Sequence, residues 1–101
     1  MKIDFGQELR TINGDPVPEG DANSKPATLR FVSVNALLNP ASEQIAGEEK
    51  VKRFDLAMQI HKSNGSIELT VENVSLVKKL VGEQYTPLIV GQAWRMLEGM
   101  E

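Results

Sequence analysis

The sequence contains no cysteine, one histidine and few aromatic residues, namely one tryptophan, one tyrosine and three phenylalanines. Without cysteine the chain can form no disulfide, no thiolate nucleophile and no zinc site with sulfur ligands. A single histidine adds too few nitrogen ligands for a transition-metal site, so we expect neither a metal nor a cofactor. Because aromatic residues are scarce, the core must consist mainly of valine, leucine, isoleucine and methionine.

Long apolar runs and an excess of positive charge are also missing. No segment approaches the roughly 18 consecutive apolar residues of a membrane-spanning helix, and the first residues lack the apolar run of a signal peptide. The formal net charge is −3 and the sequence pI is about 5.2. Proteins that bind duplex DNA mainly through charge usually carry a basic surface, so this balance argues against nucleic acid as the partner. We expect a cytoplasmic protein that does not enter a membrane.

The 101 residues, of which 41% are hydrophobic and 25% charged, predict a single globular domain, 1–101. Within it, residues 1–27 are expected to form a hairpin and a mobile loop, and residues 28–101 to be mainly helical. Asn13-Gly14 between apolar residues is typical of a hairpin with a type I′ turn, in which both central residues have positive φ. Pro16 and Pro18 restrict the return strand to an edge, and residues 18–27 have the composition of a loop.

Residues 28–38 can be interpreted as a helix or as a strand. Val32 and Val34 favour a strand, whereas Thr28 is a good N-terminal cap and Asn39-Pro40 is a good helix end. The length of the segment favours a helix. The buried face of that helix would contain Leu29, Val32 and Ala36, with Phe31, Val34 and Leu38 alongside.

Three further helices are predicted between residues 47 and 97. The first begins at Glu48 and Glu49, ends at Asn64-Gly65 and precedes a short extended segment at residues 67–69. The second runs from Thr70 to Gly82. The buried face of the first would contain Val51, Phe54, Ala57, Met58 and His61, and that of the second Val74, Val77 and Val81, with Leu76 and Leu80 beside them.

The last helix begins at Thr86-Pro87 and is apolar around most of its circumference. Such a helix is either central to its domain or shared with a partner. We therefore predict an α+β fold, with a short N-terminal β-hairpin followed by about four helices packed around the C-terminal helix. Trp94 would be a core anchor or, with Leu97 and Met96, part of a protein interface, where Gly91 would allow close approach of a neighbouring backbone.

No motif for catalysis is found. His61, the only histidine, has no nucleophile or orienting carboxylate at a recognisable spacing, so we expect a core-edge histidine and no enzyme. The segment around Gly65 resembles part of an EF-hand loop, but Ile60 and Val71 stand where calcium needs carboxylates. The basic residues that could contact phosphate, if they converged on one face, are Lys50, Lys52, Arg53, Lys78 and Lys79.

Several segments of the chain form a pattern shared with other proteins, namely Lys2-Ile3-Asp4-Phe5, Asn13-Gly14, Val34-Asn35-Ala36-Leu37-Leu38, residues 47–54 with Leu56-Ala57, Leu69-Thr70-Val71-Glu72 and residues 88–94. In these segments the chain resembles small proteins encoded by tailed bacteriophages and prophages. Those proteins also begin with a lysine-hydrophobic-Asp-Phe stretch and an early Asn-Gly or Asp-Gly turn. These motifs are structural, and no functional residue is transferred from them.

Together these observations predict a non-enzymatic phage or prophage component in the cytoplasm of a bacterial host. It would act through protein–protein contacts, with a protein partner or by self-association into a homo-oligomer, as an assembly factor or minor structural component. The alternative is a small regulatory protein that contacts nucleic acid or the host machinery that acts on nucleic acid.

Overall fold

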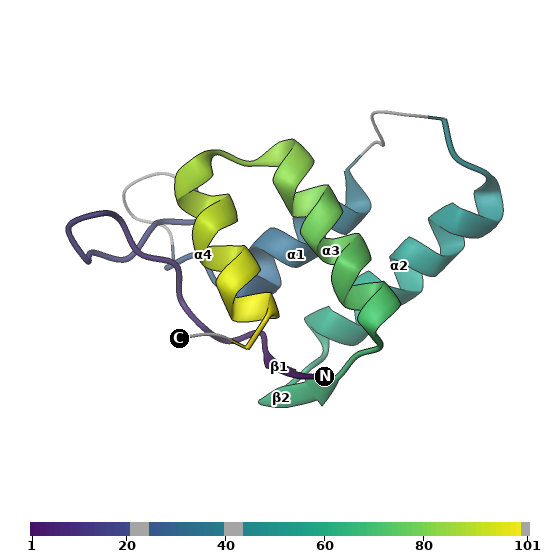
Figure 1. Cartoon of the computed structure of the whole chain (residues 1–101), viewed down its shortest axis with the longest axis horizontal. Coiled ribbons are helices and arrows are strands. Elements are labelled where there is room, and N and C mark those ends of the chain that lie inside the picture. The colour runs from purple at the N-terminus through teal and green to yellow at the C-terminus, as the bar shows by residue number, and fades with distance from the viewer. Residues whose placement is uncertain (21–24, 40–43, 100–101) are drawn as a thin grey trace.

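The computed structural model describes residues 1–20, 25–39 and 44–99, which form a small α+β fold (Figure 1). In chain order the elements are β1 (Lys2–Asp4), α1 (Leu29–Leu38), α2 (Gly47–His61), β2 (Ser66–Glu68), α3 (Val71–Gln84) and α4 (Pro87–Leu97). This confirms the predicted α+β class and the four predicted helices. Of the helices described, none has the length and apolar character needed to cross a membrane.

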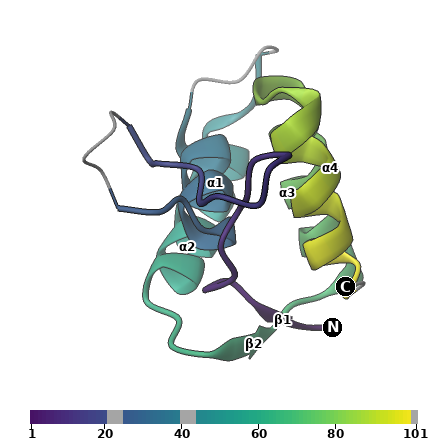
Figure 2. The ribbon, with the colours of Figure 1, turned by 90° about the vertical axis from the view of Figure 1, so that its left-hand side faces the viewer.

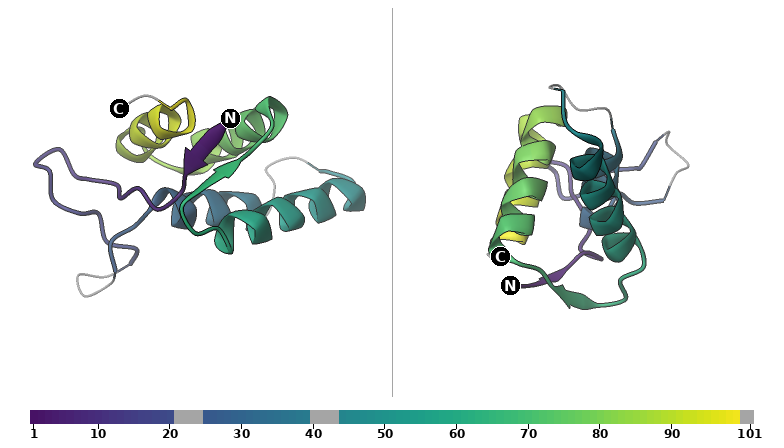
Figure 3. Two further views of the ribbon diagram at one scale, coloured as in Figure 1. Left: turned by 90° about the horizontal axis from the view of Figure 1, so that it is seen from below. Right: turned by 90° about the vertical axis from the view of Figure 1, so that its right-hand side faces the viewer.

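The two strands join the start of the chain to its middle. β1 and β2 are antiparallel, with Ile3 opposite Ile67, and they lie side by side below the helices (Figure 3, left). Ile3 is buried, while Lys2 and Asp4 on either side of it are exposed, as alternation along a strand requires. The Met1 ammonium group continues the pairing by donating a hydrogen bond of 2.7 Å to the Leu69 carbonyl. The extended segment predicted near residues 67–69 is therefore confirmed, and its partner is β1.

Three short extended segments between β1 and α1 form a closed ring of hydrogen bonds. Leu9 N–H donates to the Ala27 carbonyl (3.0 Å), Ala27 N–H to Val17 (2.6 Å), and Val17 N–H to Leu9 (3.0 Å). We call this arrangement the three-segment ring. Leu9 and Ala27 are buried within it and Val17 is half-buried, so the ring attaches the N-terminal region to the core.

The predicted N-terminal hairpin is confirmed, but the predicted type I′ turn is wrong. Arg10 pairs with Pro16, and Thr11 N–H donates to the Asp15 carbonyl at 2.7 Å. Gly14 has φ of +91°, whereas no non-glycine residue in the described part of the chain has positive φ. The turn is thus a three-residue loop in which only Gly14 is left-handed. Of the predicted mobile loop, residues 18–27, positions 21–24 lie outside the described residues, and Glu19 N–H bonds to the Lys25 carbonyl beside them.

The central helix is α1, which the sequence left open between helix and strand. The Thr28 hydroxyl accepts a hydrogen bond from Phe31 N–H (3.2 Å), as predicted for a cap, and Leu29, Val32 and Ala36 are buried as predicted. α1 lies between α2 on one side and α3 with α4 on the other (Figure 2).

The prediction that the helices pack around the C-terminal helix is wrong. α4 lies at the side of the bundle, on α3, with smaller contacts to α1 and β1. Only Ala93 and Leu97 are buried in α4, against five residues in the shorter α1. The physical reason is that α1 buries one broad face, which is wide enough to contact α2, α3 and α4, whereas most apolar residues of α4 are only partly buried.

The predicted buried face of α2 is confirmed at Ala57 but wrong at its other positions. The buried residues are Arg53, Leu56, Ala57 and Ile60, whereas Val51 and Phe54 are 59% and 52% exposed. This helix carries two adjacent apolar stripes. The buried stripe contains a charged residue, Arg53, among its apolar residues. Its guanidinium is accommodated because its Nε bonds to the Glu49 carboxylate at 3.3 Å, while its alkyl part packs in the core.

Arg30 connects α1 to the end of α2. Its Nε donates to the Ile60 carbonyl (3.3 Å) and its Nη2 to the Ser63 carbonyl (3.0 Å). Helix C-termini leave carbonyl groups without internal partners and carry partial negative charge, so a guanidinium there is favourable. The predicted stop at Asn64-Gly65 is too late, because α2 ends at His61 with Lys62 as its C-cap; Gly65, with φ of +86°, is left-handed but belongs to the turn that leads into β2.

The starts of α3 and α4 agree with the sequence. The Thr70 hydroxyl accepts a hydrogen bond from Asn73 N–H (3.1 Å), and Val74, Val77, Leu80 and Val81 are buried. α4 begins at Pro87 after Thr86. The predicted end of α3 at Gly82 is wrong, because the helix continues to Gln84. Gly82 instead makes room for the Trp94 ring, which would lie 3.3 Å from a Cβ atom at this position.

Ser33 gives a prediction of increased stability. It is fully buried in α1, and its hydroxyl is without a hydrogen-bond partner among the described residues. Burying such a group costs about 1–3 kcal/mol, so Ser33→Ala should raise the free energy of unfolding by about 1 kcal/mol. Ser75→Ala, at an exposed position of α3, measures the gain from helix propensity alone. Urea denaturation that gives Ser33→Ala no larger gain than Ser75→Ala would contradict the prediction.

Candidate protein-interaction surface

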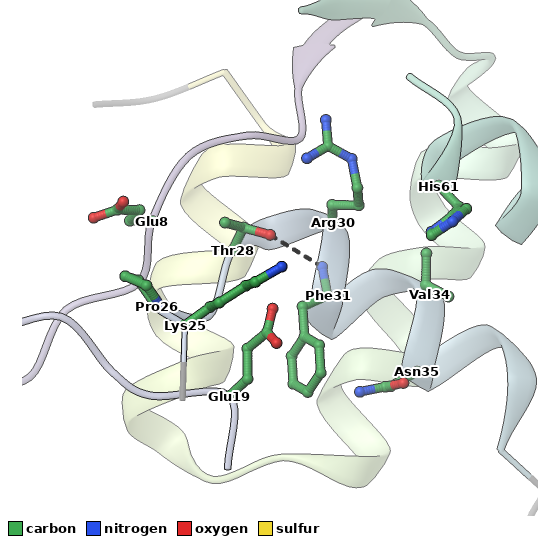
Figure 4. Close-up of a pocket in the computed structure, with 10 residues that line it drawn as sticks. All are labelled: Glu8, Glu19, Lys25, Pro26, Thr28, Arg30, Phe31, Val34, Asn35 and His61. Carbon is green, nitrogen blue, oxygen red and sulfur yellow. Dashed lines mark hydrogen bonds between the residues drawn. The ribbon is translucent and has the colours of Figure 1, made fainter. Parts of the chain in front are cut away.

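The outward side of α1 and α2 carries two adjoining hollows, which we call the trough. They share Val34 and His61, which places them side by side along the two helices. The apolar hollow has a volume of about 250 Å³ and is lined by Val34, Leu38, Phe54, Ala57, Met58 and His61. The polar hollow has a volume of about 640 Å³ and is lined by Glu8, Glu19, Lys25, Pro26, Thr28, Arg30, Phe31, Val34, Asn35 and His61 (Figure 4).

The trough exists because each helix has a second apolar stripe that the core covers only in part. On α1, Phe31, Val34 and Leu38 follow each other at spacings of three and four residues, opposite the buried face. Leu38 is 53% exposed. On α2, Phe54 and Met58 continue this apolar surface, with Val51 one turn before Phe54. Contiguous exposed apolar surface of this kind marks sites where another molecule binds.

The polar hollow differs in chemistry from the apolar one. Glu19 and Lys25 extend toward it from the segments beside the three-segment ring, and both line it together with Phe31 of α1 (Figure 4). The Arg30 guanidinium is held by the end of α2. His61 stands on the opposite side of the hollow from Glu8 (Figure 4). In the described part of the chain no hydrogen bond joins His61 to a carboxylate, and no group of three or more histidine or acidic residues could hold a metal ion.

The four residues predicted for a protein interface lie apart from the trough, on α4. Leu97 is fully buried, so it belongs to the core and its predicted place at an interface is wrong. Met96 is half-buried and packs on the core, and Gly91 is exposed with open space where a Cβ atom would stand. Trp94 is 38% exposed.

Trp94 is held on the surface of α3. Its indole Nε1–H donates to the Lys78 carbonyl at 3.0 Å, and the Lys78 ammonium group lies 4.8 Å from the centre of the ring. Lys78 also pairs with Glu98 at 3.0 Å. Trp94 therefore fastens α4 to α3, while one side of its ring stays accessible in a shallow hollow with Lys79 and Gly82.

The five basic residues considered for phosphate contact do not form one surface. Arg53 is buried and paired with Glu49. Lys52 lines a hollow between α2 and α3 together with Glu49, Asp55 and Glu72. Lys78 and Lys79 line the different hollow beside Trp94, and Lys50 is exposed in the first turn of α2. Because acids surround Lys52 and Glu98 pairs with Lys78, little net positive charge gathers at either hollow.

Among the residues that the structure describes, two titratable groups have displaced pKa values. Burial raises the pKa of the Tyr85 hydroxyl, an effect partly offset by its hydrogen bond with the Asn35 side chain. The pKa of Glu68 is lowered, mainly by its hydrogen bond with the Met1 ammonium group and by the charge of that group. Neither side chain lines the trough, so the binding properties of the trough do not depend on a displaced titration.

Sequence reasoning named several trough residues but assigned them to the core. The missed signal is the pair of apolar stripes on α1, Leu29-Val32-Ala36 and Phe31-Val34-Leu38, of which a single neighbouring layer can cover only one. What the trough offers a ligand is apolar contact at one end and carboxylate and ammonium groups at the other. Comparison of the chain with models of protein families, with curated proteins and with solved structures finds no match.

Proposed function

We propose that this protein works by binding protein through the trough, as an assembly factor or minor structural component of a tailed phage or prophage. The observation that supports the proposal is the apolar end of the trough, where Leu38 and Phe54 expose about half of their surface beside each other. Covering such surface is favourable by about 25 cal/mol per Å² of apolar area, before the cost of association.

The phage context rests on the resemblance of the sequence to small proteins of tailed phages. It is compatible with the chemistry of the trough, which provides contact area and no arrangement of nucleophile, base and orienting group. The alternative of a regulatory protein that binds nucleic acid has less support, since its five basic residues lie at separate places, Arg53 and Lys78 are paired with acids, and Lys52 shares a hollow with acids.

A photo-crosslinking amino acid at position 38 or 54 tests the proposal in the bacterial cell that carries the gene. We expect crosslinks to one or a few protein chains at both positions, because the trough would be covered by protein. The same amino acid in place of Glu83, an exposed residue of α3, serves as the control and should give none of these products. Equal products at position 83, or no protein product at positions 38 and 54, would refute the proposed function.

A further inference from the structure

We propose that the apolar end of the trough is covered by the same surface of a second copy of the chain, with the two α2 helices antiparallel across a two-fold axis. The inference rests on the proposed function and specifies the partner. A two-fold dimer uses one self-complementary patch twice, so the question is whether this patch can complement itself.

The spacing of the exposed stripe on α2 meets that condition. Val51, Phe54, Met58 and His61 alternate in steps of three and four residues, like the contact positions of a coiled coil. The series is symmetric about its midpoint. In an antiparallel pair Phe54 therefore faces the partner copy's thioether at position 58, and Val51 faces the imidazole at position 61. A thioether against an aromatic ring is a favourable contact.

Charge along α2 selects the antiparallel direction. Glu48 and Lys62 flank the apolar stripe on the same side of the helix, at opposite ends, and both are exposed. Antiparallel packing brings each glutamate near the lysine of the other copy, whereas parallel packing would place these residues on opposite sides of the contact, where they cannot pair. The helix dipoles are also opposed in the antiparallel pair. Asp55 lies between Glu48 and Lys62 on the same side of the helix and lines the hollow toward α3, so its repulsion from the Asp55 of the other copy acts against the two glutamate–lysine contacts.

α1 enlarges the patch on the other side of the stripe. Val34 and Leu38 lie next to Phe54 and Met58 around the apolar hollow, so the contact would involve two helices from each copy. A four-helix contact of this kind buries the apolar stripes of α1 and α2 together, and the polar end of the trough remains at the rim.

The cysteine-free sequence allows a direct test of the antiparallel geometry. The full-length double variant Val51→Cys with His61→Cys should form a covalent dimer on mild oxidation, because each new thiol faces the other thiol of the partner copy. Each single variant should stay largely uncrosslinked, because neither position faces itself. Crosslinking of the single variants with no gain in the double variant would overturn the proposal.

Sedimentation equilibrium of the full chain tests the surface itself. We expect dimers, with the dissociation constant raised about 100-fold by Phe54→Glu, since a charge would be buried in the centre of the contact. Val71→Glu, at an exposed apolar position of α3, should leave the dimer unchanged, and circular dichroism should show that both variants are folded. A monomer at all concentrations, or a dimer insensitive to Phe54→Glu, overturns the inference.

The two proposals fail in different ways. If crosslinks from positions 38 and 54 lead only to a different protein while the purified chain is monomeric, the second-copy inference is wrong and protein binding by the trough stands. If no protein crosslinks there and the chain is monomeric, both are wrong.

Discussion

Replacing Phe5 by alanine is expected to remove a large fraction of the free energy of unfolding. The Phe5 side chain is fully buried in the core, and its backbone carbonyl accepts a hydrogen bond from Arg30 N–H at the start of α1 (2.8 Å). Truncation of a buried phenylalanine to alanine costs about 3–5 kcal/mol, from lost apolar contact and from the cavity left behind. The free energy of unfolding of a small domain is about 5–15 kcal/mol in total, so this loss is a large share of it.

Urea denaturation followed by the fluorescence of Trp94 measures this effect. The matched control is Ile12→Ala, which also removes a large apolar side chain from the N-terminal region, at a position that is 90% exposed. We expect that control to change the free energy of unfolding by less than about 0.5 kcal/mol. Similar losses in the two variants would mean that Phe5 is not anchored in the core as described.

Leu97→Ala should have the second largest effect, a loss of about 2–5 kcal/mol in the free energy of unfolding. Leu97 is fully buried in the last turn of α4, where α4 meets the rest of the core. Gln92 on the same helix binds the Arg10 backbone in both directions, with its Oε1 accepting at 2.8 Å and its Nε2 donating at 2.6 Å. Loss of the Leu97 contact would therefore also loosen the attachment of the N-terminal segments.

Met96→Ala is the control for Leu97→Ala, because it shortens a neighbouring side chain that is only half-buried. Its cost should be smaller than that of Leu97→Ala, in proportion to the area it buries. The comparison separates a core role for Leu97 from the interface role that the sequence suggested. A stable Leu97→Ala variant that loses self-association would favour the interface role and contradict the buried position.

Local signals in the sequence were enough for the helices. Thr28, Thr70 and Thr86-Pro87 mark three helix starts, because helix caps act within a few residues. The α+β class and the buried stripe of α3 follow from the same local patterns. These features require no knowledge of what packs against each helix.

The packing of the helices could not be predicted in the same way. α2 has two apolar stripes, and which one is buried depends on α1, a neighbour that the pattern does not identify. Arg53 made the correct stripe look polar, although a guanidinium can be buried by its alkyl part when a carboxylate is near. The apolar circumference of α4 predicts a central position for this helix. In the structure, several of its apolar residues are only half-buried, at the side of the bundle.

The pairing of segments that are far apart in the sequence is even less evident from local sequence patterns. β1 and β2 have three residues each, too few to establish a register from alternation alone. The three-segment ring closes through prolines and loops, where propensities predict only turns. The trough could not be predicted for a similar reason. An apolar stripe in a sequence does not show whether another part of the same chain covers it.

The pairing of β1 with β2 has a consequence for how the protein is made. While the chain emerges from the ribosome, β1 has no strand to pair with until Ile67 has been translated. The Arg10 backbone likewise has no hydrogen bonds with Gln92 until α4 has been synthesised. These segments are made early, but they complete their contacts only after β2 and α4 have emerged.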